Sequence, residues 1–272
     1  MKKRAYDLAF PIGIACSSSE TLRGAGLQFL SFPGDWTSPL IAPLPASNLI
    51  VRIDWLCRGF DDFFNADDFI FRSRNNETGK DVYGNMRTRY IFNHDFTAGS
   101  DLATEIPKVA AKYTRRRNRL LELIRGARRV LVFRLDFPTG ADPTSVEDCR
   151  HAHRRLLETF PGVEFDFVLM QPDRTHTLET RLVEQLEPWL FRIAFDYRDP
   201  KKPDDLLYPN LKSTSAALAA FATVRDYRTH EEKRKHDRLH REKRYQKFGA
   251  KSWLDYQRIR LAKGFAKLFG RA

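Results

Sequence analysis

A cysteine near the N-terminus stands between an apolar run and a helix-starting pattern. The apolar residues 8–14 read as a short buried strand, and Cys16 follows two positions later. The next residues, SSSE, match the S-x-x-E capping box and predict a helix over 18–25. Unpaired N–H groups at a helix start favour a thiolate, which makes Cys16 a candidate nucleophile. The alternative is that Cys16 is a small, unreactive residue that packs between the strand and the helix.

Further polar residues follow predicted strands later in the chain. Asp136 ends a strand expected at 129–137, and Asp173 and His176 follow one expected at 163–170. In an open α/β sheet, ligand-binding groups gather beyond the carboxyl ends of the strands. The spacing Asp173-x-x-His176 is also that of the acid–base element of lipase- and esterase-like hydrolases, whose nucleophile here would be Cys16 or a neighbouring serine.

The elements that position these residues alternate along the chain. Strand patterns at 129–137, 163–170 and 189–197 are separated by helical patterns at 144–159 and 178–187. Such alternation implies right-handed crossovers, so the fold class is α/β, with a mainly parallel sheet flanked by helices in three layers. The earlier part of the chain predicts strands at 27–32 and 87–96, a half-buried helix at 60–69 and a long helix at 105–125.

The cysteine content and the N-terminal pattern bear on the compartment. Three cysteines in 272 residues are too few for a disulfide framework, which favours a reducing, cytoplasmic location. The basic start MKKR and the apolar stretch LAFPIGIAC at 8–16 resemble a lipoprotein signal. Asp7, Pro11 and Gly13 interrupt that pattern. No apolar run approaches the ~20 residues that span a bilayer.

The positive charge is concentrated at the C-terminus. Residues 225–272 hold 16 Lys and Arg against 6 Asp and Glu, whereas the chain as a whole has a net charge of +12. We therefore expect an α/β body over 1–203 and a helical, strongly basic extension over 204–272. Residues 253–271 pair an apolar face with a basic one, typical of a helix on an anionic membrane surface, although the same face would also pack on the body. Nucleic acid is disfavoured as a partner because no stacking aromatic pattern accompanies the charge.

Several short motifs occur in an order that resembles a known family. These are IGIAC at 12–16, LRGAGL at 22–27, PGDW at 33–36, NADDF at 65–69 and HDF at 94–96. Together they resemble a bacterial family of uncharacterised proteins described as papain-like cysteine peptidases, over about residues 6–200. Papain-like enzymes pair a cysteine helix with an antiparallel sheet. In this chain Gly34 stands where the family pattern has Phe.

The resemblance implies a role for each motif residue. Cys16 would be the nucleophile and His94 its general base, with Asp35 or Asp95 orienting the imidazole. Trp36 would lie beside the substrate. The expected function is a cysteine-dependent hydrolase, either a peptidase or an acyl-transfer enzyme, without a metal or cofactor.

Two other functions are compatible with the same sequence. The first is a sugar- or nucleotide-sugar-binding protein of a surface-polysaccharide pathway, peripheral to the inner face of the membrane. Its crevice would use Asp35, Arg134 and Asp136 instead of the thiol. The second is an adaptor in which only the basic tail binds lipid or nucleic acid. The substrate class, whether peptide, acyl group or glycan, is not encoded in a motif.

Overall fold

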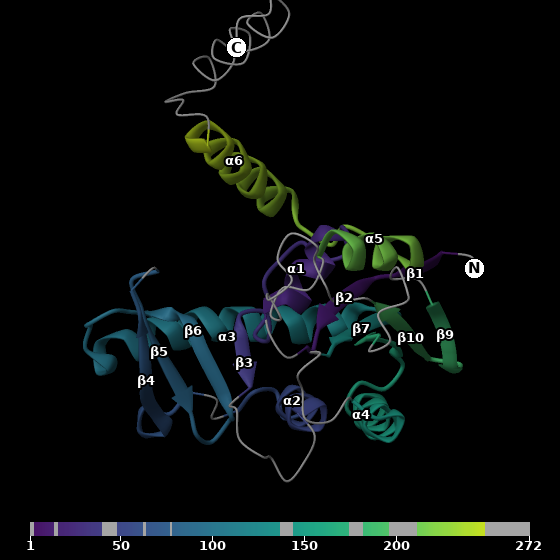
Figure 1. The fold of residues 1–272 in the computed structure, drawn as a ribbon, viewed down its shortest axis with the longest axis horizontal. Coiled ribbons are helices and arrows are strands. Elements are labelled where there is room, and N and C mark those ends of the chain that lie inside the picture. Colours follow the sequence, from purple (N-terminus) through teal and green to yellow (C-terminus); the bar gives the residue numbers. More distant parts are fainter. Residues whose placement is uncertain are drawn as a thin grey trace, which may run out of the picture. The chain divides into compact units, whose positions relative to one another are not determined.

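The computed structural model describes eight segments of the chain: 3–13, 16–39, 48–61, 64–76, 78–136, 144–173, 182–195 and 211–247 (Figure 1). They belong to two compact units, Met1–Asp226 and Tyr227–Ala272. The first unit is an α/β body, as the alternation of strand and helix patterns predicted.

The central element of the body is a five-stranded mixed sheet. Its strands lie in the order β2-β7-β8-β10-β9, and all neighbouring pairs are parallel except β10 with β9. The inner strands are continuous apolar runs because helices cover both of their faces. The strands are β2 (Leu8–Pro11), β7 (Arg129–Leu135), β8 (Glu164–Pro172), β10 (Leu190–Phe195) and β9 (Leu182–Glu187).

Helices lie on the two sides of this sheet. On one side are α1 (Cys16–Gly24) and α5 (Leu211–Phe221), which pack on each other (Figure 1). On the other side are α2 (Asn48–Cys57) and α4 (Val146–Thr159), which also form a pair. Side chains of β7 alternate between the two sides, so Leu131, Phe133 and Leu135 share a core with Leu22 of α1.

A second sheet is antiparallel throughout. Its order is β3-β6-β5-β4, with strands at Thr37–Pro39, Tyr90–Thr97, Lys80–Asn85 and Phe69–Asn75. The long helix α3 (Leu102–Gly126) packs on it and begins at Asp101, whose carboxylate accepts a hydrogen bond from the Thr104 N–H. An aromatic cluster joins helix and sheet: Phe64, Phe69, Phe92, Phe96 and Tyr113.

The body extends further along the chain than the boundary expected at residue 203. Strand β11 (Ala222–Val224) pairs in parallel with β1 (Arg4–Tyr6), and α5 packs on α1. These contacts place 211–224 in the body and move the division to 226. In the second unit, α6 (His230–Lys247) lies within the stretch 204–272 that was expected to be helical. Among the described helices, none combines the length and the hydropathy that crossing a bilayer requires.

Three predicted elements differ from the structure. The helix expected at 178–187 is instead strand β9 where the structure describes it, because 182–187 form a hairpin with β10 across Pro188 and Trp189. Residues 27–32, expected as a strand, lie in a loop without ladder pairing. The helix expected at 60–69 is reduced to a 3₁₀ turn, η1 (Ala66–Asp68), which leads into β4. The tail helix expected at 253–271 lies outside the described residues.

Candidate functional site

Cys16 is the first residue of α1, five positions after Pro11, the last residue of β2. Its side chain is half-buried, and none of the three cysteines forms a disulfide. The helix therefore begins before Ser17, which is inside the first turn and does not act as the expected cap. A Cβ at Gly13 would stand 1.7 Å from the Ser18 hydroxyl, so the turn that presents Cys16 needs glycine at this position.

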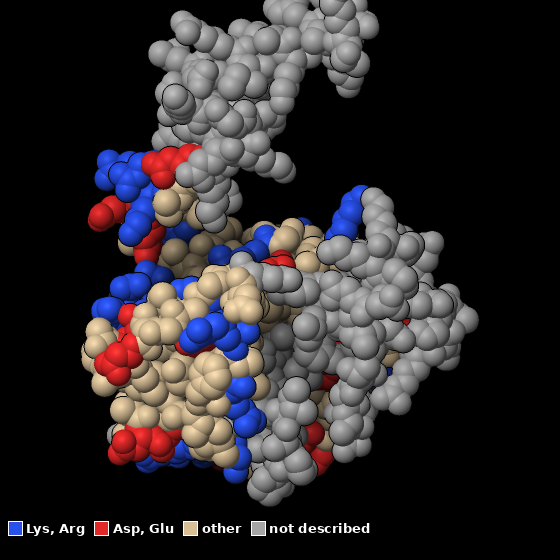
Figure 2. All heavy atoms as spheres, turned by 60° about the vertical axis from the view of Figure 1, so that its left-hand side comes forward, with Lys and Arg blue, Asp and Glu red and all other residues tan. Residues whose placement is uncertain are grey.

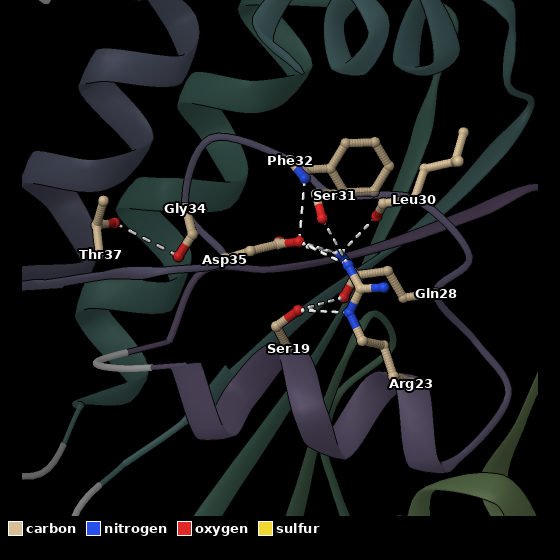
Figure 3. A network of polar contacts seen from close by, with 9 residues as sticks. All are labelled: Ser19, Arg23, Gln28, Leu30, Ser31, Phe32, Gly34, Asp35 and Thr37. Carbon is tan, nitrogen blue, oxygen red and sulfur yellow. Dashed lines mark hydrogen bonds and ion pairs between the residues drawn. The ribbon is translucent and has the colours of Figure 1, made fainter. Parts of the chain in front are cut away.

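The loop that carries the PGDW motif is tied to α1 through Asp35 (Figure 3). The fully buried Asp35 carboxylate accepts hydrogen bonds from Gln28 Nε2 at 2.8 and 2.9 Å, from Phe32 N at 3.0 Å and from Arg23 Nη2 at 3.0 Å. Burial raises the pKa of Asp35, and the coulombic attraction of Arg23 and these hydrogen bonds act in the opposite direction. Asp35 thus anchors the loop and does not touch His94.

Trp36, the next residue of the motif, lies between α1 and His94. Its ring meets the His94 ring edge-on, with centroids 6.1 Å apart. The guanidinium carbon of Arg23 lies 6.0 Å from the centroid of the same indole ring. Because Arg23 belongs to α1, these contacts bring His94 of strand β6 close to the helix that begins at Cys16.

Glu20 is a half-buried carboxylate of α1 whose charge interacts with that of His94. It lies one helical turn after Cys16, and its pKa is raised by burial and lowered by the charges of Arg23 and His94. In the sequence Glu20 belongs to the S-x-x-E pattern, and its i, i+4 spacing from Cys16 puts the two residues on one side of the helix. The described contacts therefore join Arg23 near the end of α1 to Trp36 and His94, and Cys16 is the first residue of the same helix.

Asp95, the other carboxylate expected to orient His94, points to the opposite face of β6. Successive residues of a strand alternate between its faces, and Asp95 is buried against α3 while His94 is exposed. There Asp95 forms an ion pair with Lys112 and accepts a hydrogen bond from the Tyr113 hydroxyl at 3.0 Å. Asp95 therefore joins helix α3 to the antiparallel sheet.

The residues expected to bind a sugar, Arg134 and Asp136, bind each other. Arg134 Nε donates to Asp136 Oδ1 at 2.9 Å, and Arg134 Nη1 donates to the carbonyl of Ile12 at 3.0 Å. Asp136 also accepts from the Thr144 N–H at 2.8 Å and from Gln171 Nε2 at 3.0 Å. Arg134 is 4% exposed and Asp136 is 2% exposed. This network lies between the five-stranded sheet and α4, on the opposite side from α1.

A second buried guanidinium, which sequence reasoning missed, lies near Arg134. Arg52 of α2 is 1% exposed, donates one hydrogen bond to the carbonyl of Thr37 at 3.2 Å and lies 4.7 Å above the Tyr90 ring. Its Nε and Nη1 groups have no hydrogen-bond partner. Burial, together with the charge of Arg134, lowers the pKa of Arg52 to about 10. The sequence gives no sign of it, because an arginine in an apolar helix ordinarily reaches solvent.

The alternative pair at the end of β8 is described only in part. Asp173 follows the strand directly, and its backbone N–H donates to the carbonyl of Phe195 at 2.6 Å. His176 lies outside the described residues, so the pairing of Asp173 with His176 stays a prediction. Within the described segments, no three His, Cys, Asp or Glu side chains converge as metal ligands.

Comparison with known proteins found no matching family model, no matching curated protein and no matching solved structure. The resemblance to papain-like peptidases therefore rests on the order of the motifs in the chain, and the site is defined by the contacts described above.

Removing the Asp35 carboxylate is expected to destabilise the body. Asp35→Ala removes the buried carboxylate that accepts from Gln28 and Phe32 and forms an ion pair with Arg23, which should lower the free energy of unfolding by about 3 kcal/mol. Urea denaturation followed by tryptophan fluorescence measures the change. Asp67→Ala removes an exposed carboxylate and should cost less than about 0.5 kcal/mol. Equal stability of the two variants would contradict the anchoring role of Asp35.

Proposed function

We propose that this chain is a cysteine-dependent hydrolase or acyl-transfer enzyme, with Cys16 as nucleophile and His94 as general base. The observation that carries the proposal is the series of contacts from Arg23 of α1 through Trp36 to His94. It is supported by the position of Cys16 at a helix start and of His94 in an antiparallel sheet, which is the combination that the resemblance implies.

The chemistry follows from these two side chains. The His94 imidazole takes the proton of the Cys16 thiol, and the thiolate attacks the carbonyl carbon of the substrate. The proton passes to the leaving group as the carbonyl bond to it breaks, which leaves a thioester on Cys16. Water or another acceptor then attacks the thioester, gives up its proton to His94 and releases the thiol. Backbone N–H groups at the start of α1 would stabilise the negative charge on the carbonyl oxygen.

Glu20 takes the place of Asp35 and Asp95 as the carboxylate that acts on His94. An adjacent carboxylate stabilises the imidazolium that forms when the thiol is deprotonated, and it favours one orientation of the ring. The edge contact with Trp36 restricts the ring from the other side. Asp35 contributes indirectly, by fixing the loop from which Trp36 extends.

The remaining parts of the proposal concern the architecture and the partners. The five-stranded sheet with its two helix pairs would be a three-layer core, and residues beyond 226 a helical basic extension that holds the protein at an anionic membrane surface. A sugar-binding crevice at Arg134 and Asp136 is a weaker alternative, since both side chains are used in internal contacts.

Alkylation of the three thiols as a function of pH tests the proposal. Burial raises the pKa of Cys149 to about 12 and also raises the pKa of Cys57, so these thiols should react slowly in the folded protein. Cys16 is expected to react first with iodoacetamide, with a midpoint below the unperturbed value of about 8.5. Mass spectrometry of the peptides assigns each adduct. A Cys16 midpoint at or above 8.5 would argue against activation.

A further inference from the structure

A groove rich in arginine lies on the body, away from the Cys16 site. It has a volume of about 980 Å³ and is formed by β1, the residues just before and at the start of β7, and the end of β11. The segments are fixed to one another by backbone hydrogen bonds from Asp7 N to Arg129 O and from Arg225 N to Tyr6 O. We call this feature the basic groove; its charged lining residues are Lys3, Arg4, Asp7, Arg128, Arg129 and Arg225.

Two of its guanidinium groups are held in place from below. The Asp166 carboxylate, which is 5% exposed, accepts from Arg4 Nη1 at 3.1 Å, from Arg129 Nη2 at 2.8 Å and from the Tyr6 hydroxyl at 2.8 Å. The Arg4 guanidinium also lies 4.1 Å above the Phe191 ring. One buried carboxylate thus orients two cations of the groove.

The other three cations of the groove are exposed and have no acidic partner in the described structure. They are Lys3, Arg128 and Arg225. The lining carboxylate, Asp7, accepts hydrogen bonds from the backbone N–H groups of Arg128 and Arg129 at 2.9 and 3.0 Å. Glu164 lies 3.7 Å from Arg129 at the edge. The groove therefore has a surplus of positive charge, whereas the face of the molecule in Figure 2 carries both acidic and basic groups.

The chemistry of the lining selects the ligand. Guanidinium groups match the geometry of phosphate oxygens, and a row of them suits a chain of phosphates. The surface is concave and lacks an exposed large apolar side chain, which argues against a flat lipid surface. Its aromatic lining residue, Tyr6, is 3% exposed, so base stacking would contribute nothing here and the affinity would come from the phosphates alone. We propose that the basic groove binds single-stranded nucleic acid through its phosphates, without reading its bases.

Fluorescence anisotropy with a labelled oligothymidylate and the full chain tests this inference. Arg128→Glu with Arg225→Glu should weaken binding at low salt by about tenfold or more and lower the slope of log K against log salt by about 1.4, because each phosphate contact to a single strand contributes about 0.7. The matched control is Arg72→Glu with Arg115→Glu, two exposed cations of β4 and α3. It carries the same change in net charge and leaves the tail intact, so it should retain the slope of the unchanged protein.

Three results would overturn the inference. These are no binding by the unchanged protein at low salt, an equal loss in both double variants, and a preference for anionic vesicles that the groove variant alone abolishes. The last result would assign the groove to membrane. Thermal unfolding checks that the variants are folded. If the groove variant does not fold, Arg225→Gln alone should lower the salt slope by about 0.7, and an unchanged slope would count against the groove.

Discussion

Asp136→Ala is expected to lower the free energy of unfolding by about 4 kcal/mol, which is a large part of the stability of an ordinary domain. Asp136 is the carboxylate of a buried network that also contains Arg134, Thr144 and Gln171. Its loss removes the carboxylate to which the Arg134 guanidinium, 4% exposed, donates. The charge of Arg134 also lowers the pKa of the buried Arg52, so the core would keep both guanidinium groups with one carboxylate fewer.

A double-mutant cycle separates this charge effect from a simple loss of packing. Arg52→Met keeps the length of the side chain and removes the buried cation whose Nε and Nη1 lack partners. In the Asp136→Ala background, Arg52→Met should therefore recover about 1–2 kcal/mol. Glu122→Ala, at an exposed position of α3, is the control and should change stability by less than about 0.5 kcal/mol. If the two core substitutions are additive, the charges are not coupled.

The parts of the fold that could be predicted are those whose local pattern agrees with their surroundings. β7 and β8 are continuous apolar runs, and α4 starts with a capping box in which Ser145 and Asp148 exchange hydrogen bonds. Residues 182–187 show the limit of such reasoning. Leu, Glu and Gln favour a helix, but pairing with β10 across a two-residue turn stabilises a strand there. Strand pairing is a long-range property that periodicity does not report.

The candidate site, like the fold, could be predicted from the sequence only in part. Cys16 and His94 are far apart in the sequence, which predicts Cys16 between a strand and a helix and His94 in a strand over 87–96. Which carboxylate lies beside His94 depends on strand alternation, which turns Asp95 toward α3, and on the path of the loop that buries Asp35. Neither can be read from spacing alone. Glu20, one turn from Cys16, is instead the carboxylate of α1 whose charge interacts with that of His94.

The last prediction concerns His94 and its effect on the thiol. If His94 stabilises the Cys16 thiolate, His94→Gln should raise the alkylation midpoint of Cys16 to about 8.5. At pH 6 the thiolate of such a cysteine is scarce, so alkylation should slow by about tenfold or more, even though a thiolate of higher pKa is intrinsically more nucleophilic. Glu20→Gln should raise the midpoint by a smaller amount, because it removes a carboxylate that stabilises the imidazolium but leaves the His94 ring in place.

Two comparisons make this test specific to the site. His151→Gln replaces an exposed histidine of α4 and should leave the pH profile of Cys16 unchanged. Cys57 alkylation, recorded in the same spectra, reports on any general opening of the fold, because its thiol donates to the carbonyl of Arg155 between α2 and α4. A midpoint that is the same in His94→Gln, His151→Gln and the unchanged protein would show that His94 does not act on Cys16. If the Cys16 midpoint rises in both His94→Gln and Glu20→Gln, the imidazole acts between the thiol and the carboxylate. From that position a base can pass a proton to a leaving group.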